Sequence, residues 1–212
     1  MNQHITVAVI GATGKAGKYL MKQLLKDGYT VKALIRKPEA YILTHPSLQI
    51  IEGDIQSIPA VQKLLTGCDA VISTLGQLKD EPLISSLAAT NIISVMNEYG
   101  IKRYVFICGL NIDVPGDKKS EANIVKSEWM RSNFPVVVAD KQRAFDIVAA
   151  GNINWTMVRL PFIIQTDEKG KLAVSMDDCP GENINTSDLA EFSVGQITAT
   201  KYIKKSPFVA SL

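Results

Sequence analysis

Cysteine and histidine are both scarce in this chain of 212 residues. The three cysteines, Cys68, Cys108 and Cys179, are far apart and form no CxxC pair, so they support neither a disulfide framework nor a zinc site. The two histidines are His4, ahead of the first expected strand, and His45, in an expected loop, so neither is placed for proton transfer. No HExxH or GxSxG motif occurs, which argues against metal-assisted hydrolysis and an α/β-hydrolase triad.

A long apolar run and a strong charge imbalance are also missing. No stretch approaches the roughly 18 apolar residues that a membrane span needs, and the N-terminus lacks the pattern of a signal peptide. With 23 basic and 21 acidic residues, the formal net charge is only +2. Such a balance gives no electrostatic footprint for nucleic acid or for an acidic membrane surface. We therefore expect a cytoplasmic protein that binds neither nucleic acid nor membrane.

What is present is an ordinary globular composition, with 46% hydrophobic and 21% charged residues, which excludes a disordered chain. The length predicts a single domain over residues 1–212. Apolar runs typical of buried strands alternate with stretches at helical spacing. This alternation predicts an α/β fold, a Rossmann-like doubly wound parallel sheet with helices on both faces. The residues from about 160 onward are expected to form a small cap on the substrate side.

The expected elements follow from this pattern along the chain. Strands are predicted at 5–10, 29–35, 48–51, 70–72, 104–107, 154–159, 171–175 and 207–210. Helices are predicted at 15–26, 61–65, 83–98, 121–131, 138–150 and 188–198. The last helix follows Thr186, Ser187 and Asp188, whose side-chain oxygens predict an N-cap.

The most informative motif is the glycine-rich turn VIGATGKAG at residues 9–17. Gly11 allows a sharp turn, Gly14 lets the backbone approach a pyrophosphate, and Gly17 lets the helix pack closely on the strand. The helix N-terminus offers N–H groups and a partial positive charge to phosphates. Because a strand precedes the turn, a helix follows it and a second strand comes next, the motif predicts dinucleotide binding. The alternative is a tight turn with no ligand.

The end of the second expected strand carries Arg36 and Lys37. An NAD site commonly has Asp or Glu here to accept hydrogen bonds from the ribose, whereas an arginine accommodates a 2′-phosphate. The planar guanidinium of Arg36 suits a phosphate, and Lys37 adds charge. The sequence therefore predicts NADP as the cofactor, with NADPH preferred over NADH. The alternative is a solvated basic pair at a strand end.

Further segments follow in a family's order: Gly53-Asp54-Ile55, VISTLG at 71–76, TMVRLPFI at 156–163 and TSDLA at 186–190. With the glycine turn and Arg36, they make the chain resemble the atypical branch of the short-chain dehydrogenase/reductase superfamily. Within that branch it resembles the NmrA-like and biliverdin reductase B-like group of NAD(P)H-binding flavin reductases. The resemblance covers nearly the whole chain.

The resemblance implies where the cofactor contacts lie. Asp54 and Ile55 would sit at the adenine, 73–76 beside the adenosine and pyrophosphate, and Cys108 and Gly109 at the nicotinamide, with 161–163 on its other side. The alternatives to cofactor contacts are purely structural roles: a helix cap for Asp54, a strand end at 73–74 and a simple loop at 161–163. The predicted cofactor-binding set is Gly11, Thr13, Gly14, Lys15, Ala16, Gly17, Arg36, Lys37, Asp54, Ile55, Ser73, Thr74, Leu75, Gly76, Cys108, Gly109, Lys141, Pro161, Phe162 and Ile163.

The chain departs from the superfamily's usual Ser, Tyr and Lys, in which the Tyr stands four residues before the Lys. Lys141 is the candidate lysine, but Val137 stands four residues before it and Cys108 takes the place of the serine. The catalytic residues therefore stay unknown, with Cys108 and Lys141 as the remaining candidates. For Cys108 the sequence favours a small packing residue, and Lys141 equally fits a solvated helix lysine. Asp113 and Asp117 follow the fifth strand and are expected to be solvated.

The missing tyrosine argues against ordinary ketone reduction. It leaves hydride transfer to a flavin-like or quinone-like acceptor, which takes its proton from water. The residues from 160 to 212 are about 50 in number, too few for the substrate domain of the larger sugar-nucleotide enzymes. We therefore predict an NADPH-binding oxidoreductase with a small-molecule acceptor.

Two alternatives remain, a regulatory protein that senses NADP(H) without turnover and an epimerase or dehydratase relative. The sequence also leaves open a homodimer or a protein partner.

Overall fold

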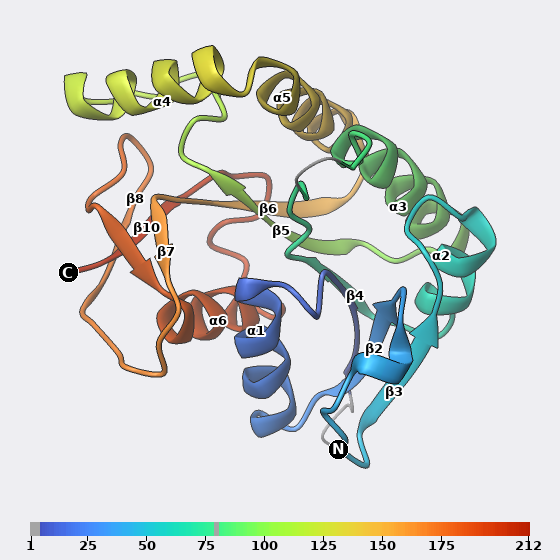
Figure 1. Ribbon diagram of the computed structural model, residues 1–212. Helices are drawn as coiled ribbons and strands as arrows, with labels where there is room; N and C mark the ends of the chain where they lie inside the picture. Colours follow the sequence, from blue (N-terminus) through green and yellow to red (C-terminus); the bar gives the residue numbers. More distant parts are fainter. Residues whose placement is uncertain (1–4, 79–80) are drawn as a thin grey trace.

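The computed structural model describes residues 5–78 and 81–212, so His4 lies outside the described residues. They form a ten-stranded sheet in the order β3-β2-β1-β4-β5-β6-β10-β9-β7, in which β8 also pairs with β10. Helices cover both faces of this sheet (Figure 1). The predicted α/β class, a Rossmann-like doubly wound sheet, is confirmed.

The order of the parallel strands reverses between β1 and β4. From β1 the chain adds β2 and β3 on one side, then returns to add β4, β5 and β6 on the other. Ligands of such sheets bind in the crevice at the carboxyl ends of the strands, at this point of reversal. The parallel strands are β1 (Thr6–Ile10), β2 (Thr30–Ile35), β3 (Leu48–Glu52), β4 (Ala70–Ser73), β5 (Arg103–Gly109), β6 (Asn154–Leu160) and β10 (Phe208–Ser211).

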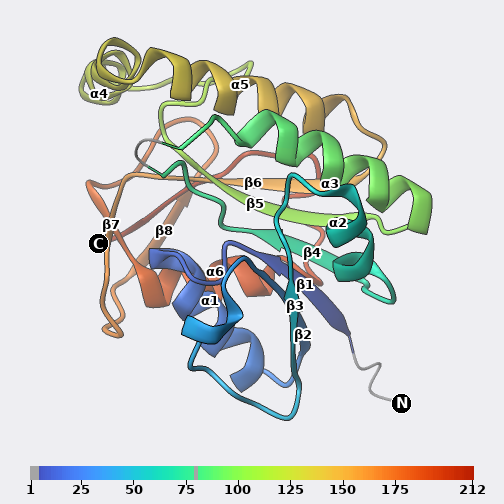
Figure 2. The same ribbon diagram turned by 45° about the vertical axis from the view of Figure 1, so that its right-hand side comes forward.

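The helices form one layer on each face of the sheet (Figure 2). One layer contains α1 (Lys15–Lys26) and α6 (Thr186–Gly195), which pack against each other. The other contains α2 (Ile58–Leu65), α3 (Ser85–Tyr99) and α5 (Pro135–Ala150), with α4 (Glu121–Asn133) packed against α5. A short 3-10 helix, η1 (Pro38–Ala40), follows β2.

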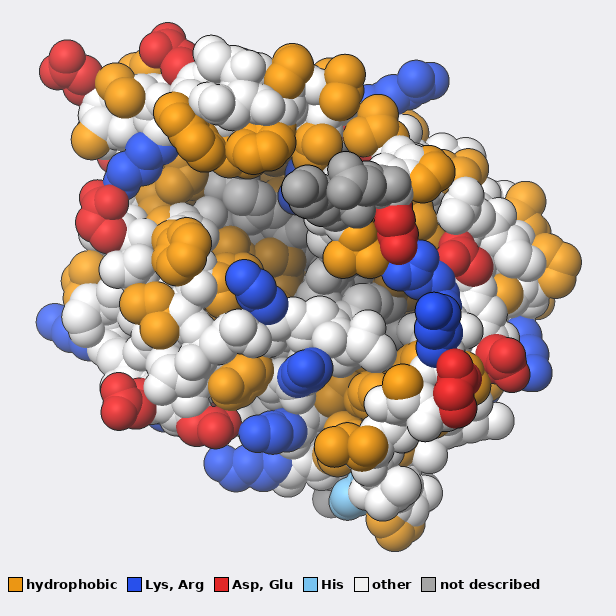
Figure 3. Space-filling model, in the orientation of Figure 1, with side chains coloured by type: hydrophobic (Ala, Val, Ile, Leu, Met, Phe, Trp, Pro, Cys, Tyr) orange, Lys and Arg blue, Asp and Glu red, His pale blue; other side chains and the backbone are white. Residues whose placement is uncertain are grey.

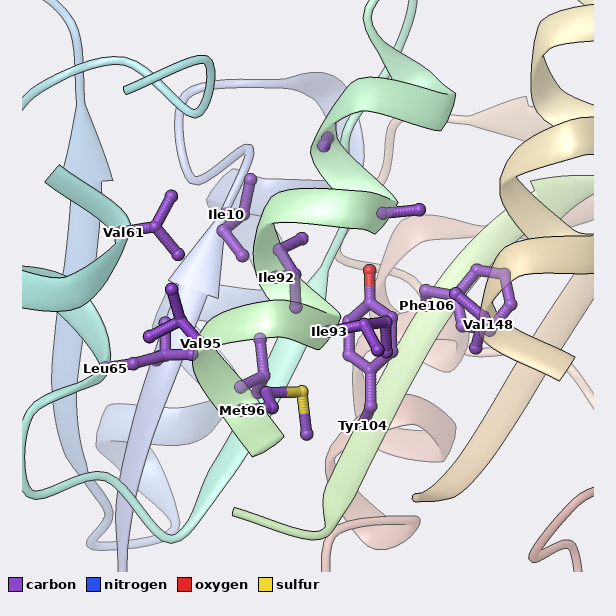
Figure 4. Close-up of a cluster of buried hydrophobic side chains, with 14 of the residues drawn as sticks. Ile10, Val61, Leu65, Ile92, Ile93, Val95, Met96, Tyr104, Phe106 and Val148 are labelled. Atoms are coloured by element: carbon purple, nitrogen blue, oxygen red, sulfur yellow. The ribbon is translucent and has the colours of Figure 1, made fainter. Parts of the chain in front are cut away.

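Alternation along the buried strands divides the core into two halves. In β1, Val7 and Val9 belong to the cluster on the side of α1 and α6, and Ala8 and Ile10 to the cluster beneath α2, α3 and α5. Figure 4 shows part of the second cluster, in which residues of β1 and β5 meet those of the helices above. Since successive strand residues point to opposite faces, a strand buried on both faces is apolar throughout, as the sequence predicted.

The segment after β6 extends the sheet. Its β10 lies beside β6 and pairs with β8 (Leu172–Ser175) and β9 (Asn183–Asn185), and β7 (Phe162–Ile164) pairs with β9. The short β7 and β9 were not predicted, because three residues are too few for a periodic pattern.

The predicted N-cap of α6 is wrong. The helix begins at Thr186, and its N-cap residue, Asn185, makes no side-chain capping bond. Thr186 Oγ1 accepts instead from the Thr166 amide at 3.0 Å, and Asp188 Oδ2 accepts from the Gly170 amide at 2.9 Å. These two side-chain oxygens anchor the loop before β8. That loop runs past the start of the helix, and its backbone amides need hydrogen-bond acceptors.

The start of α3 is fixed from outside its own segment. Asp140 of α5 accepts hydrogen bonds from the amides of Ser85 at 2.8 Å and Ser86 at 3.3 Å. A carboxylate at a helix N-terminus satisfies free N–H groups and complements the helix dipole. This contact anchors α5 beside α3 and so positions the next residue, Lys141, at the cleft described below.

Candidate functional site

The glycine turn has the close packing that its three glycines predict. Gly11 has φ +82°, and a Cβ there would lie 2.8 Å from the backbone of Thr74. At Gly17 a Cβ would lie 2.0 Å from the carbonyl oxygen of Gly11. Gly14 is the N-cap residue of α1, and neither a capping side chain nor an acidic residue covers the first turn. The helix therefore presents open N–H groups and its positive end to the crevice.

A cleft of about 1370 Å³ begins at this turn. It exceeds the roughly 300–1,000 Å³ of ordinary small-molecule pockets, which suits a ligand of dinucleotide length. Figure 3 shows the molecule hollowed on this face, with Lys and Arg side chains around the opening. Of the predicted cofactor-binding residues, all but Gly17 and Ser73 line it.

The two exceptions lie just behind the cleft wall. Gly17 faces the turn, as its packing requires. Ser73 lines a separate cavity of about 40 Å³ between the sheet, α3 and α5, together with Tyr104, Cys108 and Lys141. Burial raises the pKa of Tyr104 above its ordinary value, which keeps that phenol protonated.

One end of the cleft is basic and lies beyond β2. Arg36 and Lys37 line it, as do Asp54 and Tyr41. Asp54 Oδ1 accepts from the Gln56 amide at 2.8 Å, while the cap of α2 is Ser57. Asp54 therefore does not cap that helix and shapes the turn before it.

Arg36 is paired in this structure. Its guanidinium donates to both carboxylate oxygens of Glu81, at 2.9 and 3.3 Å. That hydrogen bond is the main reason why the pKa of Arg36 is raised above its ordinary value. No sequence pattern predicted Glu81 as the partner, since 45 residues separate the pair.

The other end of the cleft is formed by the carboxyl ends of β5 and β6. Cys108 and Gly109 come from β5, Pro161 and Phe162 follow β6, and Lys141 reaches in from α5. The Phe162 side chain is 71% exposed. The wall of this end is apolar, apart from one lysine and one half-buried thiol.

Among the described residues, no phenol stands at this end of the cleft. Among the residues that line it, the one tyrosine is Tyr41, which lies just beyond η1 at the basic end. Tyr104 is buried in the core. A proton donor of the Tyr-Lys type is therefore lacking among the cleft-lining residues.

Some residues that line the cleft were not predicted, although their spacing in the sequence indicated them. Lys18 and Lys22 line the cleft with Lys15, at three- and four-residue spacing along α1. Helical periodicity places these lysines on one face, so they were within reach of prediction. Gln77 and Glu81 had no comparable signal, because the loop between β4 and α3 has no period.

The expectation that Asp117 is solvated is wrong. Its side chain is only 13% exposed and forms an ion pair with Arg159 at 2.5 Å, so it is not a solvated loop carboxylate. Arg159 is a buried charge in β6 and needs a partner, which the loop after β5 supplies. Asp113, in contrast, is 59% exposed, as predicted.

Cys108 is predicted to resist alkylation in the folded protein. Burial raises the pKa of its thiol to about 11, and the opposing charges of Lys141 and Arg159 do not offset this. At neutral pH we expect iodoacetamide to modify Cys108 more than about tenfold more slowly than a free cysteine, because the thiolate is the nucleophile. Peptide mass spectrometry would measure the rate, with the urea-unfolded chain as control. Modification at the free rate would contradict this and favour a reactive, catalytic thiol.

Neither metal sites nor membrane helices are found in the described part of the chain. Within residues 5–78 and 81–212, no three His, Cys, Asp or Glu side chains are grouped so as to hold a metal ion. Across the same ranges, no helix combines the length and the apolar character that crossing a membrane requires.

A doubly wound sheet with a glycine turn at its point of reversal and a dinucleotide-sized cleft defines a nucleotide-binding Rossmann protein. Residues 11–200 match the family described as NAD(P)H-binding, and the chain belongs to that family. Its fold is that of the NAD(P)H-binding oxidoreductases, which confirms the resemblance to short-chain dehydrogenase/reductases.

Individual relatives are distant. Cinnamoyl-CoA reductase 1 of Arabidopsis thaliana is 29% identical over 142 residues, which are 61% of this chain and 41% of the plant protein. The chain thus spans less than half of that relative. The uncharacterized chloroplastic protein At2g34460 of the same plant is 26% identical over 200 residues, 89% of this chain and 70% of the relative. A short-chain dehydrogenase/reductase from Veillonella parvula, solved in complex with NADP, shares the fold with a TM-score of 0.81 at 16% identity, over 98% and 94% of the two chains.

Proposed function

We propose that this protein is an NADPH-dependent reductase that transfers hydride to a flat acceptor of the flavin or quinone type. The observation that carries the proposal is that one end of the cleft is basic and the other end is apolar. Arginine and lysine line the end beyond β2, and an apolar wall without a phenol lines the other.

The residues of the cleft suit this dinucleotide. The open N-terminus of α1, where Gly14 lines the cleft, would receive the pyrophosphate. Arg36 and Lys37 would receive the 2′-phosphate, and Lys141 would approach the ribose next to the nicotinamide. The bound cofactor supplies a hydride. The chain itself binds, orients and shields the reacting rings.

The acceptor class follows from the reacting end. Val137 stands where the phenol is expected, and burial raises the pKa of the Cys108 thiol to about 11, so neither position supplies the usual acid for a carbonyl oxygen. A flavin or quinone takes its proton from water and needs mainly correct placement. The exposed ring of Phe162 and the apolar Ile163 offer a surface on which such a ring stacks. The related plant reductase and the NADP-bound neighbour agree with hydride chemistry.

A second candidate is an NADP(H)-sensing module without turnover. The missing phenol favours it, and so does an exposed apolar surface on α4 and the start of α5. Val125, Trp129 and Val136 are 58%, 57% and 61% exposed there. Exposed apolar patches of this kind often contact another protein.

The test follows NADPH and NADH oxidation by the nicotinamide absorbance, with FMN and then a quinone as acceptor. We expect saturable turnover that prefers NADPH. Arg36→Ala should raise the KM for NADPH about 10- to 100-fold and leave NADH little changed, because it removes a charge-assisted contact. Arg143→Ala, at an exposed position outside the cleft, is the control.

Equal losses for the two cofactors in Arg36→Ala would contradict the phosphate assignment. Absence of turnover in a chain that NADPH stabilises against heat would reject the reductase and favour the sensor.

A further inference from the structure

The ion pair between Arg36 and Glu81 joins two strand ends that border the same cleft. Arg36 follows β2, Glu81 belongs to the connection between β4 and α3, and both line the basic end. The contact is two-pronged, with Nη1–Oε2 at 2.9 Å and Nη2–Oε1 at 3.3 Å. The two side chains are 49% and 41% exposed, so the pair is open to solvent and to a ligand.

Gln77 contacts the backbone carbonyls of Glu81 and Pro82. The Gln77 side-chain amide donates to the carbonyls of Leu78 at 3.0 Å, Glu81 at 3.0 Å and Pro82 at 3.2 Å. Gln77 itself lines the cleft. The two N–H groups of this amide are shared among the three carbonyls, which links Gln77 to the chain at Glu81 and Pro82.

These two charges have opposite preferences for the adenosine ribose. A carboxylate accepts hydrogen bonds from free ribose hydroxyls, whereas an arginine pairs with a 2′-phosphate. In most sites of this fold one of the two stands at the end of β2. Here the arginine stands at β2, and the carboxylate approaches from the β4 side to meet it.

We infer that Glu81 is a cofactor-specificity residue, which competes with the 2′-phosphate for Arg36 and limits the preference for NADP over NAD. This inference rests on the proposed role of Arg36 as the phosphate ligand. A 2′-phosphate competes with Glu81 for the N–H groups of the Arg36 guanidinium, and its binding places two negative groups near each other. Binding of NAD meets neither opposition.

The size of the effect follows from the exposure of the pair. Exposed ion pairs are weak, so removing the charge of Glu81 should tighten NADP⁺ by about fivefold. NAD⁺ lacks the 2′-phosphate, so its affinity should not increase. The ratio of the two affinities is therefore the quantity that reports on Glu81.

The experiment titrates NADP⁺ and NAD⁺ calorimetrically into wild type, Glu81→Gln and Glu52→Gln. Glu52 is an exposed residue at the end of β3 outside the cleft, so its variant carries the same charge change without the contact. We expect the NADP⁺-to-NAD⁺ affinity ratio to rise about fivefold in Glu81→Gln and to stay at the wild-type value in Glu52→Gln. An unchanged or lower ratio in Glu81→Gln, or an equal rise in Glu52→Gln, would overturn the inference.

The outcomes separate this inference from the proposed function. If wild type binds both nucleotides equally and Glu81→Gln prefers NADP⁺, the proposed NADPH preference fails and the role of Glu81 stands. If wild type prefers NADP⁺ and Glu81→Gln keeps the same ratio, the preference stands and the role of Glu81 fails. If wild type binds neither nucleotide, both are overturned.

Discussion

Gly17→Ala is expected to destabilise the folded protein by about 3 kcal/mol or more, whereas the same change at Gly195 should be neutral or stabilising. An alanine Cβ at Gly17 would lie 2.0 Å from the Gly11 carbonyl oxygen and 2.9 Å from two backbone atoms of Ala12. No side-chain rotation relieves a clash with backbone, so α1 must move away from β1. At Gly195, in the last turn of α6, nothing lies within 4 Å.

Alanine has a higher helix propensity than glycine, and a Cβ at Gly195 meets no other atom. Gly195→Ala should therefore raise the free energy of unfolding by up to about 1 kcal/mol. The two variants thus carry the same chemical change with opposite expected signs. Urea unfolding followed by circular dichroism measures both midpoints. NADPH binding should also be lost in Gly17→Ala, because the shift of α1 moves the N–H groups of the glycine turn. Wild-type stability in Gly17→Ala would show that this glycine does not set the distance between α1 and β1.

The first half of the fold was predictable because its signals are local. The bounds of α1 were predicted as found, since Gly14 and the Asp27-Gly28 pair punctuate both ends. Short apolar runs predicted the buried strands. The start of α5 was missed by three residues, because Pro135 permits a first turn that the apolar period does not require.

The C-terminal part was harder for a physical reason. In the sheet β10 lies between β6 and β9, but nearly 50 residues separate it from β6 along the chain. A strand of four residues has no pattern that specifies its neighbour. The pairing depends on long-range contacts that composition and period do not encode.

The candidate site was predicted in its residues more fully than in its electrostatics. The glycine turn and Arg36 lie in positions that the fold fixes relative to the first two strands. The partners of the charges were not predicted, since Glu81 and Asp117 both come from loops far along the chain from Arg36 and Arg159. Spacing predicts which residues share an element, but it does not predict which loop meets which strand.

Arg159→Met is expected to destabilise the fold by about 3–5 kcal/mol, because it removes the buried guanidinium from Asp117. Among the described residues, the Asp117 carboxylate then keeps only Lys119 at 3.8 Å and the Val114 amide at 3.1 Å. Arg159 is 1% exposed and donates to Asp117 at 2.5 Å and to the carbonyls of Ile112 and Ser206. It also stacks on the ring of Phe208, 3.6 Å from its centroid. One guanidinium thus joins the loop after β5 to β6 and the segment before β10.

Arg131→Met is the matched control, since Arg131 donates to Asp113 of the same loop at 2.6 Å but is 41% exposed. An exposed pair contributes less than about 1 kcal/mol, so this variant should unfold close to wild type. Urea midpoints test the difference, and hydrogen exchange across residues 110–119 should accelerate in Arg159→Met alone. Equal midpoints for the two variants would mean that burial of the Arg159–Asp117 pair adds nothing. The loop that begins directly after Gly109 of the cleft would then be held by its backbone contacts.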